Sequence, residues 1–246
     1  MDILALSDLH GYLPNIEQPF DLMVIAGDVC PTICHGKRFQ KDWIENEFLE
    51  WIRSLNYKDK ESTVVMVWGN HDFIGYSMDE LDLAGLYSMS NDRLIILNNE
   101  PALLTYDART IKIFGTPYCT IFGRWCFMVN DDRLNELFSE IPEDFDLLIS
   151  HDSPTINKLG AILDGFWKND NTGNKVLAKY VAEKKPRMLF SGHFHSGNHN
   201  FEEIDGTYMA NVSFVNEAYE PINKCLHVEY DLKERKVVSH DIIEVK

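Results

Sequence analysis

The chain has 246 residues, 45% of them hydrophobic, and no linker rich in Pro, Gly or Ser, so we expect residues 1–246 to form a single domain with a full core. Acidic residues outnumber basic ones by 39 to 23, and the resulting net charge of −16 argues against extended nucleic acid as a partner. The five cysteines include no Cys-x-x-Cys pair, no apolar run reaches membrane-spanning length and the first residues carry no leader pattern, so we expect a cytoplasmic protein with reduced thiols and no membrane partner.

The first half of the chain consists of short aliphatic runs around one helical pattern. Such runs predict buried strands at 3–6, 22–26, 63–68, 94–97 and 110–115. The last two of these strands are expected to pair around a turn. From Ile44 to Leu55, apolar residues recur at helical spacing, which predicts an amphipathic helix covering one face of a sheet.

The second half begins with helices and ends in consecutive strands. An apolar stripe from Leu134 to Ile141 predicts a helix, with Asp131 and Asp132 as N-cap candidates and Pro142 as its end. A further helix is predicted at 174–184. Strands are predicted at 147–149, 188–190, 207–212, 226–230 and 237–242. This order of elements favours an α/β fold in which two packed mixed β-sheets are flanked by α-helices.

Short polar clusters follow five of the buried strands. They are Asp8-Leu9-His10, Gly27-Asp28, Gly69-Asn70-His71-Asp72, Ser150-His151-Asp152 and Gly192-His193-Phe194-His195. A buried strand has no use for an unpaired imidazole or carboxylate, whose burial costs several kcal/mol. Ligands of open α/β sheets bind beyond the carboxyl ends of the strands, so the five clusters are expected to converge on one site.

The residue types in these clusters are those of a metal site. Two divalent ions about 3.5–4 Å apart can activate a water as hydroxide and neutralise charge on a phosphoryl group, and a bridging carboxylate is needed to hold two cations so close. Carboxylate and amide oxygens mixed with imidazole, without a thiolate, suit manganese best among the candidates, which also include iron, zinc, nickel, cobalt and magnesium. We therefore expect two divalent metal ions as cofactors.

Together and in this order, the five clusters resemble those of the calcineurin-like metallophosphoesterase superfamily, over nearly the whole chain. The resemblance implies a four-layer α/β/β/α sandwich with one metal held by Asp8, His10 and His195, Asp28 as the bridge, and the other metal held by Asn70, His151 and His193. It also implies that His71 protonates the leaving oxygen of the substrate, a role that suits imidazole near neutral pH.

Several polar residues near these clusters have competing interpretations. Asp72 is either an orienting residue or a loop cap. Cys30, Cys34 and His35 lack the second half of a zinc site, so they are interpreted as buried or loop side chains. The remaining histidines, with His35, are interpreted as surface or structural residues: His199, His227 and His240.

The chain departs from the protein-phosphatase pattern Gly-Asp-x-x-Asp-Arg-Gly, because Gly27-Asp28 is followed by Val29-Cys30-Pro31-Thr32. It is more similar to the small uncapped phosphodiesterase branch, which includes class III cyclic-nucleotide phosphodiesterases and metallophosphoesterase-domain-containing proteins. The stretches that carry this similarity are 114–118, 146–154, 211–213 and 219–223. We expect a phosphodiesterase acting on a small phosphodiester such as a cyclic nucleotide. The alternatives are a phosphomonoesterase or protein phosphatase, a nuclease, and a non-catalytic metal-binding scaffold.

The substrate rim is expected between residues 118 and 133 and in the loop 157–174. Arg124 and Trp125 are candidates for contacts with a phosphate and a nucleobase, while Asn70 is expected to contact both substrate and metal. The alternative is an ordinary surface Arg and a packing Trp. Phe166-Trp167 is either a lid or a loop anchor. The sequence indicates no particular oligomeric state.

Overall fold

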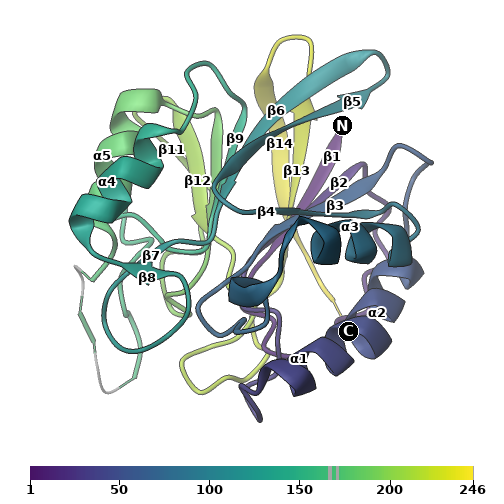
Figure 1. Cartoon of the computed structure of the whole chain (residues 1–246). Helices are drawn as coiled ribbons and strands as arrows, with labels where there is room; N and C mark the ends of the chain where they lie inside the picture. The colour runs from purple at the N-terminus through teal and green to yellow at the C-terminus, as the bar shows by residue number, and fades with distance from the viewer. Residues whose placement is uncertain (166–167, 170–171, 246) are drawn as a thin grey trace.

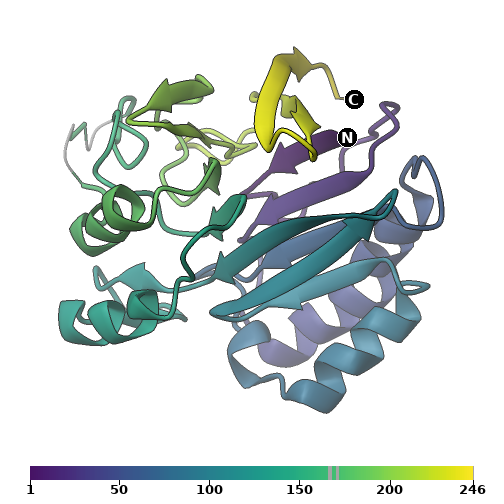
Figure 2. The same cartoon turned by 90° about the horizontal axis from the view of Figure 1, so that it is seen from above.

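The computed structural model describes residues 1–165, 168–169 and 172–245. Phe166 and Trp167, the predicted lid residues, lie outside the described residues. Two six-stranded mixed sheets pack face to face, with helices on the outer face of each, as Figures 1 and 2 show. The predicted fold class is confirmed.

The first sheet contains four parallel strands, β1 to β4, followed at the β1 edge by two antiparallel strands. In spatial order these are β14 (Lys236–Ile243), β13 (Cys225–Asp231), β1 (Asp2–Leu6), β2 (Leu22–Ala26), β3 (Thr63–Val67) and β4 (Leu94–Leu97). Apart from Asp2 and Thr63 at their first positions, the central strands β1 to β3 are apolar throughout, because both faces of this sheet are covered.

The second sheet has a parallel centre and antiparallel edges. Its order is β11 (Glu202–Ile204), β12 (Thr207–Asn211), β10 (Met188–Ser191), β9 (Leu147–Ser150), β6 (Arg109–Thr116) and β5 (Glu100–Tyr106). A separate parallel pair is formed by β7 (Cys119–Thr120) and β8 (Met128–Val129).

The helices divide between the two outer faces. Beside the first sheet lie α1 (Lys37–Trp43), a π-helical turn (Ile44–Phe48), α2 (Leu49–Ser54), a 3₁₀ turn (Gly75–Ser77) and α3 (Glu80–Met89). The second sheet carries α4 (Asp131–Ser139) and α5 (Lys175–Lys184). Figure 1 shows α4 and α5 on the opposite side of the molecule from α1 and α2.

Three apolar clusters join these layers. The central cluster lies between the sheets and takes alternate residues of the strands, such as Ile3, Val65 and Ile149. Because side chains alternate across a strand, Leu4 faces outward into the cluster under α1 and α2. Leu148 likewise faces the cluster under α4 and α5. Burial on both faces therefore holds the ends of the parallel strands in fixed positions.

Several predictions of local structure were wrong. The expected pair of strands at 94–97 and 110–115 does not exist, because β4 belongs to the first sheet and β6 pairs with β5 in the second. The N-cap of α4 is Asn130, whose side chain accepts from the N–H of Arg133, rather than Asp131 or Asp132. Helix α3 was not predicted. Its apolar residues do not lie on one face of the helix, and Leu81, for example, is 83% exposed.

Candidate metal centre

The loops after β1, β2 and β10 have strained backbones. Asp8, His10, Asp28 and His193 adopt positive φ angles of 52°, 45°, 52° and 70°, which non-glycine residues rarely do. The loops after β1 and β2 hold each other in place, because the N–H of Asp8 donates to Gly27 O and that of His10 to Asp28 O, both at 2.9 Å. Strain of this kind persists where the surroundings over-determine it, and it clusters at functional sites.

The loop after β10 packs closely against the loop after β1, at Gly192. A Cβ at Gly192 would lie 2.0 Å from Ser7 Oγ and 2.3 Å from Asp8 Oδ2, so only glycine fits there. The N–H of His193 then donates to both carboxylate oxygens of Asp8, at 3.1 and 3.0 Å. At this point the backbone of the loop after β10 packs directly against the side chains of Ser7 and Asp8, which leaves no room for a side chain at position 192.

One group of candidate ligands comprises Asp8, His10 and His195. Their ligand atoms lie within 4.8 Å of one another, and all three residues are buried. His195 Nε2 lies 3.2 Å from His10 Nε2 and 3.5 Å from Asp8 Oδ1. His195 Nδ1 donates to Asn216 O at 3.0 Å, because a carbonyl can only accept, and this leaves Nε2 directed at the other two residues.

A second group adjoins the first through Asp28. His151 Nε2 lies 2.9 Å from Asn70 Oδ1 and 3.4 Å from Asp28 Oδ2, while His151 Nδ1 donates to Ala26 O at 2.8 Å. The His193 ring lies 5.1 Å from that of His151, measured between centroids. Asp28 Oδ2 is also 3.8 Å from His10 Nε2, so the Asp28 carboxylate lies between the two groups. The structure therefore brings the seven predicted ligand side chains together.

The centre attracts positive charge. Burial alone would raise the pKa of Asp8 and of Asp28, yet the neighbouring imidazoles hold both pKa values below the usual range. Burial alone would lower the pKa of His151, yet Asp28 raises this pKa to about 10. A proton on His151 Nε2 thus occupies a place beside Asp28 in which a metal cation can replace it.

The remaining donors also fit divalent ions. Burial lowers the pKa of His10 and of His193 to about 4, which leaves both imidazoles neutral and able to ligate near pH 7. His10 Nδ1 and Asn70 Nδ2 are buried without a hydrogen-bond partner among the described residues. Carboxylate and amide oxygens with neutral imidazoles are a donor set for manganese, iron or zinc.

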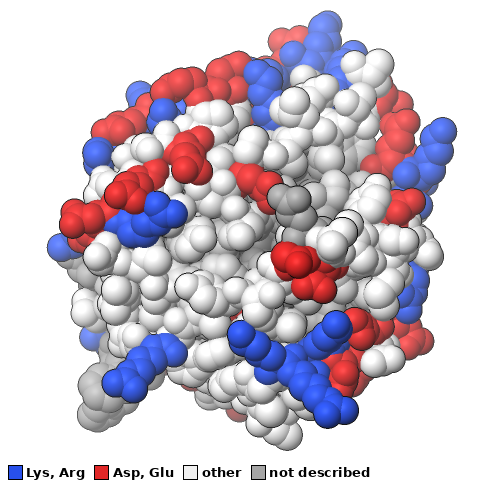
Figure 3. Space-filling model, viewed as in Figure 1, with Lys and Arg blue, Asp and Glu red and all other residues white. Residues whose placement is uncertain are grey.

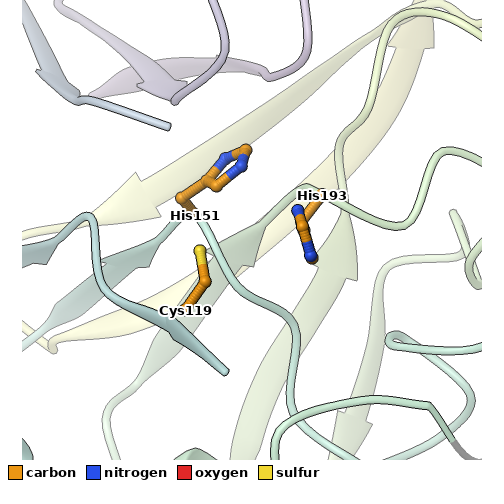
Figure 4. A group of neighbouring side chains, drawn as sticks. All are labelled: Cys119, His151 and His193. Atoms are coloured by element: carbon orange, nitrogen blue, oxygen red, sulfur yellow. The ribbon is translucent and has the colours of Figure 1, made fainter. Parts of the chain in front are cut away.

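Cys119 lies beside this centre, although no thiolate was expected there. Its sulfur and ligand atoms of His151 and His193 lie within 4.8 Å of one another, and Figure 4 shows the three side chains around one space. Burial raises the pKa of Cys119 well above its usual range, and its Sγ–H donates to Pro117 O at 3.4 Å. In this structure Cys119 is therefore a neutral thiol in the wall of the centre.

Asp72 ties together the loops after β2 and β3. Its carboxylate accepts from the N–H groups of Gly69, Val29 and Cys30 at 2.8, 3.3 and 2.9 Å. Burial, and then the charge of Asp28, raises the pKa of Asp72 to about 6. Of its two interpretations, the structure supports that of an orienting residue, because these bonds connect the loop of Asp28 to that of Asn70.

His71 is held at the mouth of the centre by its own backbone. Its N–H donates to Asp28 Oδ1 at 2.7 Å, and its carbonyl accepts from Gln40 Nε2 at 2.8 Å. The ring stacks on Trp125, with centroids 4.2 Å apart and an interplanar angle of 28°. His71 therefore faces the cavity without belonging to either ligand group.

A cavity of about 470 Å³ opens over the centre. Its lining contains the predicted ligands Asp28, Asn70, His193 and His195, the residues His71 and Asp152, and a wall of Thr120, Ile121, Phe122, Trp125, Ile162, Thr172, Phe194, Glu217 and Tyr219. Trp125 thus lies where the sequence placed it, while Arg124 is exposed and does not line the cavity. Phe122 lies within the rim expected between residues 118 and 133. Tyr219 was not predicted as a lining residue, although it begins the stretch 219–223 that carried part of the family resemblance.

His35, interpreted from the sequence as a surface or structural residue, lies against the site. Its Nε2 is 3.2 Å from His71 Nδ1. The sequence held no signal for this contact, because the loop between β2 and α1 has no periodic pattern. Two other histidines outside the clusters have structural contacts: His199 lies within hydrogen-bond distance of the carbonyls of Asn211 and His195, and His227 bonds to Asp2. His240 is exposed.

Comparison with known proteins identifies the family. The model of the calcineurin-like phosphoesterases matches residues 1–197, and the chain belongs to that family. Over 200 residues it is 27% identical to the probable rhamnogalacturonate lyase C of Emericella nidulans, covering 79% of the chain but spanning only 17% of that protein's length. It is also 27% identical over 233 residues to UPF0046 protein C25E10.12 of Caenorhabditis elegans, covering 87% of the chain and 75% of the relative.

Solved structures share the fold at low identity. The phosphopantetheinyl hydrolase of Mycobacterium tuberculosis superposes with a TM-score of 0.51 at 14% identity, covering 88% of this chain and 90% of the other. None of the helices in the described part of the chain is both long and apolar enough to cross a membrane. Family membership and the buried His and Asp groups support a phosphoester hydrolase with a dinuclear metal centre.

Proposed function

We propose that the protein is a dinuclear metal-dependent phosphodiesterase that acts on a small phosphodiester such as a cyclic nucleotide. The observation that carries the proposal is the convergence of two ligand groups on Asp28, directly below a cavity of about 470 Å³. Cavities of this size suit small molecules.

One ion would be held by Asp8, His10 and His195, and the other by Asn70, His151 and His193. Asp28 would bind both ions. Among the candidate divalent metals we propose manganese. Bound divalent ions supply a nucleophile derived from water at neutral pH and neutralise charge on the phosphoryl oxygens. The protein's own contribution is to orient the ligands, through the bonds from His151 to Ala26 O and from His195 to Asn216 O.

His71 is the proposed general acid. Its ring faces the cavity, lies 5.0 Å from that of His10 between centroids, and is free of the ligand groups. As the bond between phosphorus and the leaving oxygen breaks, a proton moves from His71 Nε2 to that oxygen, which leaves as an alcohol. Asn70 is proposed to contact the phosphoryl group beside its metal.

The walls of the cavity favour a diester over a monoester. Among the described residues that line it, none is Lys or Arg, so cationic side chains do not supplement the metals there. A diester carries one negative charge, whereas a monoester carries nearly two near neutral pH and gains more from such cations. Ile121 and Phe122, 54% and 60% exposed, offer apolar surface to the second ester group. Trp125 is proposed to contact a base, and Arg124 to approach the substrate from the rim.

A nuclease is disfavoured by the distribution of charge. On the face drawn in Figure 3, Lys and Arg form separate groups, divided by uncharged or acidic surface, rather than a continuous band. With a net charge of −16, counterion release on binding a polyanion would be small.

We further propose that the chain forms one domain, because the late strand β13 pairs with the first strand, β1. We also propose a cytoplasmic location, because the five cysteines are free thiols.

The test is a panel of substrates with the manganese-loaded protein. We expect cleavage of a nitrophenyl phosphodiester and of 2′,3′- or 3′,5′-cyclic nucleotides, with slower cleavage of nitrophenyl phosphate. Asp28→Asn should lose activity and bound metal, whereas Asp92→Asn, at an exposed position with φ of 60° that suits Asn, should retain both. Faster cleavage of the monoester would make the protein a phosphomonoesterase. Absence of all cleavage by the metal-loaded protein would favour a non-catalytic scaffold.

A further inference from the structure

The side chain of His35 contacts the His71 ring at its Nδ1 atom. It comes from the loop between β2 and α1, and its Nε2 lies 3.2 Å from His71 Nδ1. Within the described part of the chain, no other side chain hydrogen-bonds to a ring nitrogen of His71. The orientation of the His71 ring therefore depends on this contact and on the stacking described next.

Aromatic rings confine the pair from the side. Trp125 stacks on His71, with centroids 4.2 Å apart, and receives His35 edge-on at 5.3 Å and 81°. Phe73 lies 5.4 Å from His35, at 38°. Offset and edge-to-face arrangements of this kind are favourable and restrict ring rotation. Three segments remote in the chain thus hold the two imidazoles in contact, and of the two only His71 lines the cavity.

We propose that His35 is a positioning residue that accepts a hydrogen bond from His71 Nδ1 and thereby directs His71 Nε2 at the leaving oxygen of the substrate. This inference rests on the proposed role of His71. In the acid form, both ring nitrogens of His71 carry protons. The proton on Nε2 passes to the leaving oxygen, while the proton on Nδ1 stays in the bond to His35, so that His71 ends as the neutral Nδ1–H tautomer.

An imidazole, which never carries a negative charge here, suits this place better than a carboxylate would. The substrate phosphate is anionic, and Asp28 and Asp8 already bring two buried negative charges to the centre. His35 orients its neighbour without adding a third. Because it is half-buried and lies on a loop, its replacement leaves the apolar clusters untouched.

The test compares two phosphodiesters that differ only in the leaving group, a nitrophenolate and a simple alkoxide. An acid matters little for a leaving group that is stable as an anion and much for an alkoxide. His35→Ala should lower kcat for the alkoxide substrate by about 10-fold or more, part of the roughly 10²–10⁴ that general acid–base catalysis contributes. KM, metal content and nitrophenolate release should stay within about 2-fold of the parent protein. His35→Gln, whose side-chain oxygen accepts a hydrogen bond, should recover much of the loss.

Two further measurements separate positioning from a merely structural role. The double variant His35→Ala/His71→Ala should be no slower than His71→Ala on the alkoxide substrate, because the two residues act as a unit. Nitrogen NMR of the His71 ring should report the Nδ1–H tautomer in the parent protein and a mixture in His35→Ala. His240→Ala, at an exposed position remote from the cavity, serves as the matched control.

The outcomes distinguish the two proposals. If His71→Ala cleaves both substrates as the parent protein does, the proposed acid is wrong. If His71→Ala shows the expected dependence on the leaving group but His35→Ala slows both substrates equally, or not at all, the role of His35 is wrong. Additive losses in the double variant, or an unchanged tautomer in His35→Ala, would likewise overturn it.

Discussion

Replacing Gly69 by Ala tests whether the loops of the centre are as rigid as their contacts imply. Gly69 lies between β3 and Asn70, and a Cβ there would be 2.2 Å from Asp28 Oδ1, 2.4 Å from Asp28 N and 2.7 Å from Asp28 Cγ. Since ordinary contact begins at 3.4 Å, Asp28 or the loop of Gly69 would have to shift by about 1 Å. The bond from His10 N–H to Asp28 O and that from Gly69 N–H to Asp72 oppose such a shift.

The expected cost of Gly69→Ala is about 1–3 kcal/mol in the free energy of unfolding, as for other overpacked sites. Misplacement of a ligand by about 1 Å should also lower kcat/KM on the order of 100-fold. Urea denaturation measures the first quantity, and elemental analysis after dialysis should find fewer than two bound ions per chain.

Gly85→Ala provides the matched control. Gly85 is exposed in α3, and a Cβ there would meet no atom within 4 Å. This variant should gain up to about 1 kcal/mol through helix propensity and bind metal as the parent protein does. If Gly69→Ala unfolds at the same urea concentration as the parent protein and keeps its full metal content, the loops yield easily and our reasoning about Asp28 fails.

Two further predictions concern stability away from the site. Asp146→Ala should cost about 2–4 kcal/mol in urea denaturation, because its buried carboxylate accepts from Tyr230 Oη at 2.7 Å and also from Lys112 N–H and Arg235 Nε, both at 2.8 Å. Tyr230→Phe removes only the first of these bonds and should cost about 1 kcal/mol, so equal losses would contradict this. Burial opposes ionisation of Asp2, but hydrogen bonds from Lys58 and His227 hold its pKa below 3.8. A carboxylate whose pKa is lower in the folded than in the unfolded protein stabilises the fold at any pH above its unfolded pKa, and this stabilisation is lost as the pH falls through its folded pKa. Asp2→Asn should therefore cost about 0.5–1 kcal/mol at pH 7. The cost should vanish by pH 2; a gap that persisted there would refute the assignment.

Much of the fold followed from local sequence because each central strand is an aliphatic run closed by a polar residue. The strands at 22–26 and 94–97 were predicted with the bounds that the structure has. Helix α3 and strand β5 were missed, since Leu81 and Leu103 place apolar side chains in solvent and blur the periodicity. The partner of β6 was wrong because pairing between sheets depends on long-range packing that no local pattern records.

The candidate ligands were accessible from sequence for the same reason, as His and Asp at the ends of apolar runs have no structural use there. The surroundings of His71 were not. His35 and Trp125 reach the centre from irregular loops, and Cys119 from the two-residue strand β7. Trp125 was expected at the rim, but its stacking on His71 was not, because the conformations of such loops are set by contacts with other segments rather than by their own residues. Sequence alone therefore indicated which side chains are candidate metal ligands, because a buried charge requires a partner. Only the tertiary structure showed that His35 contacts the proposed acid His71, because the two residues are brought together by the packing of segments remote in the chain.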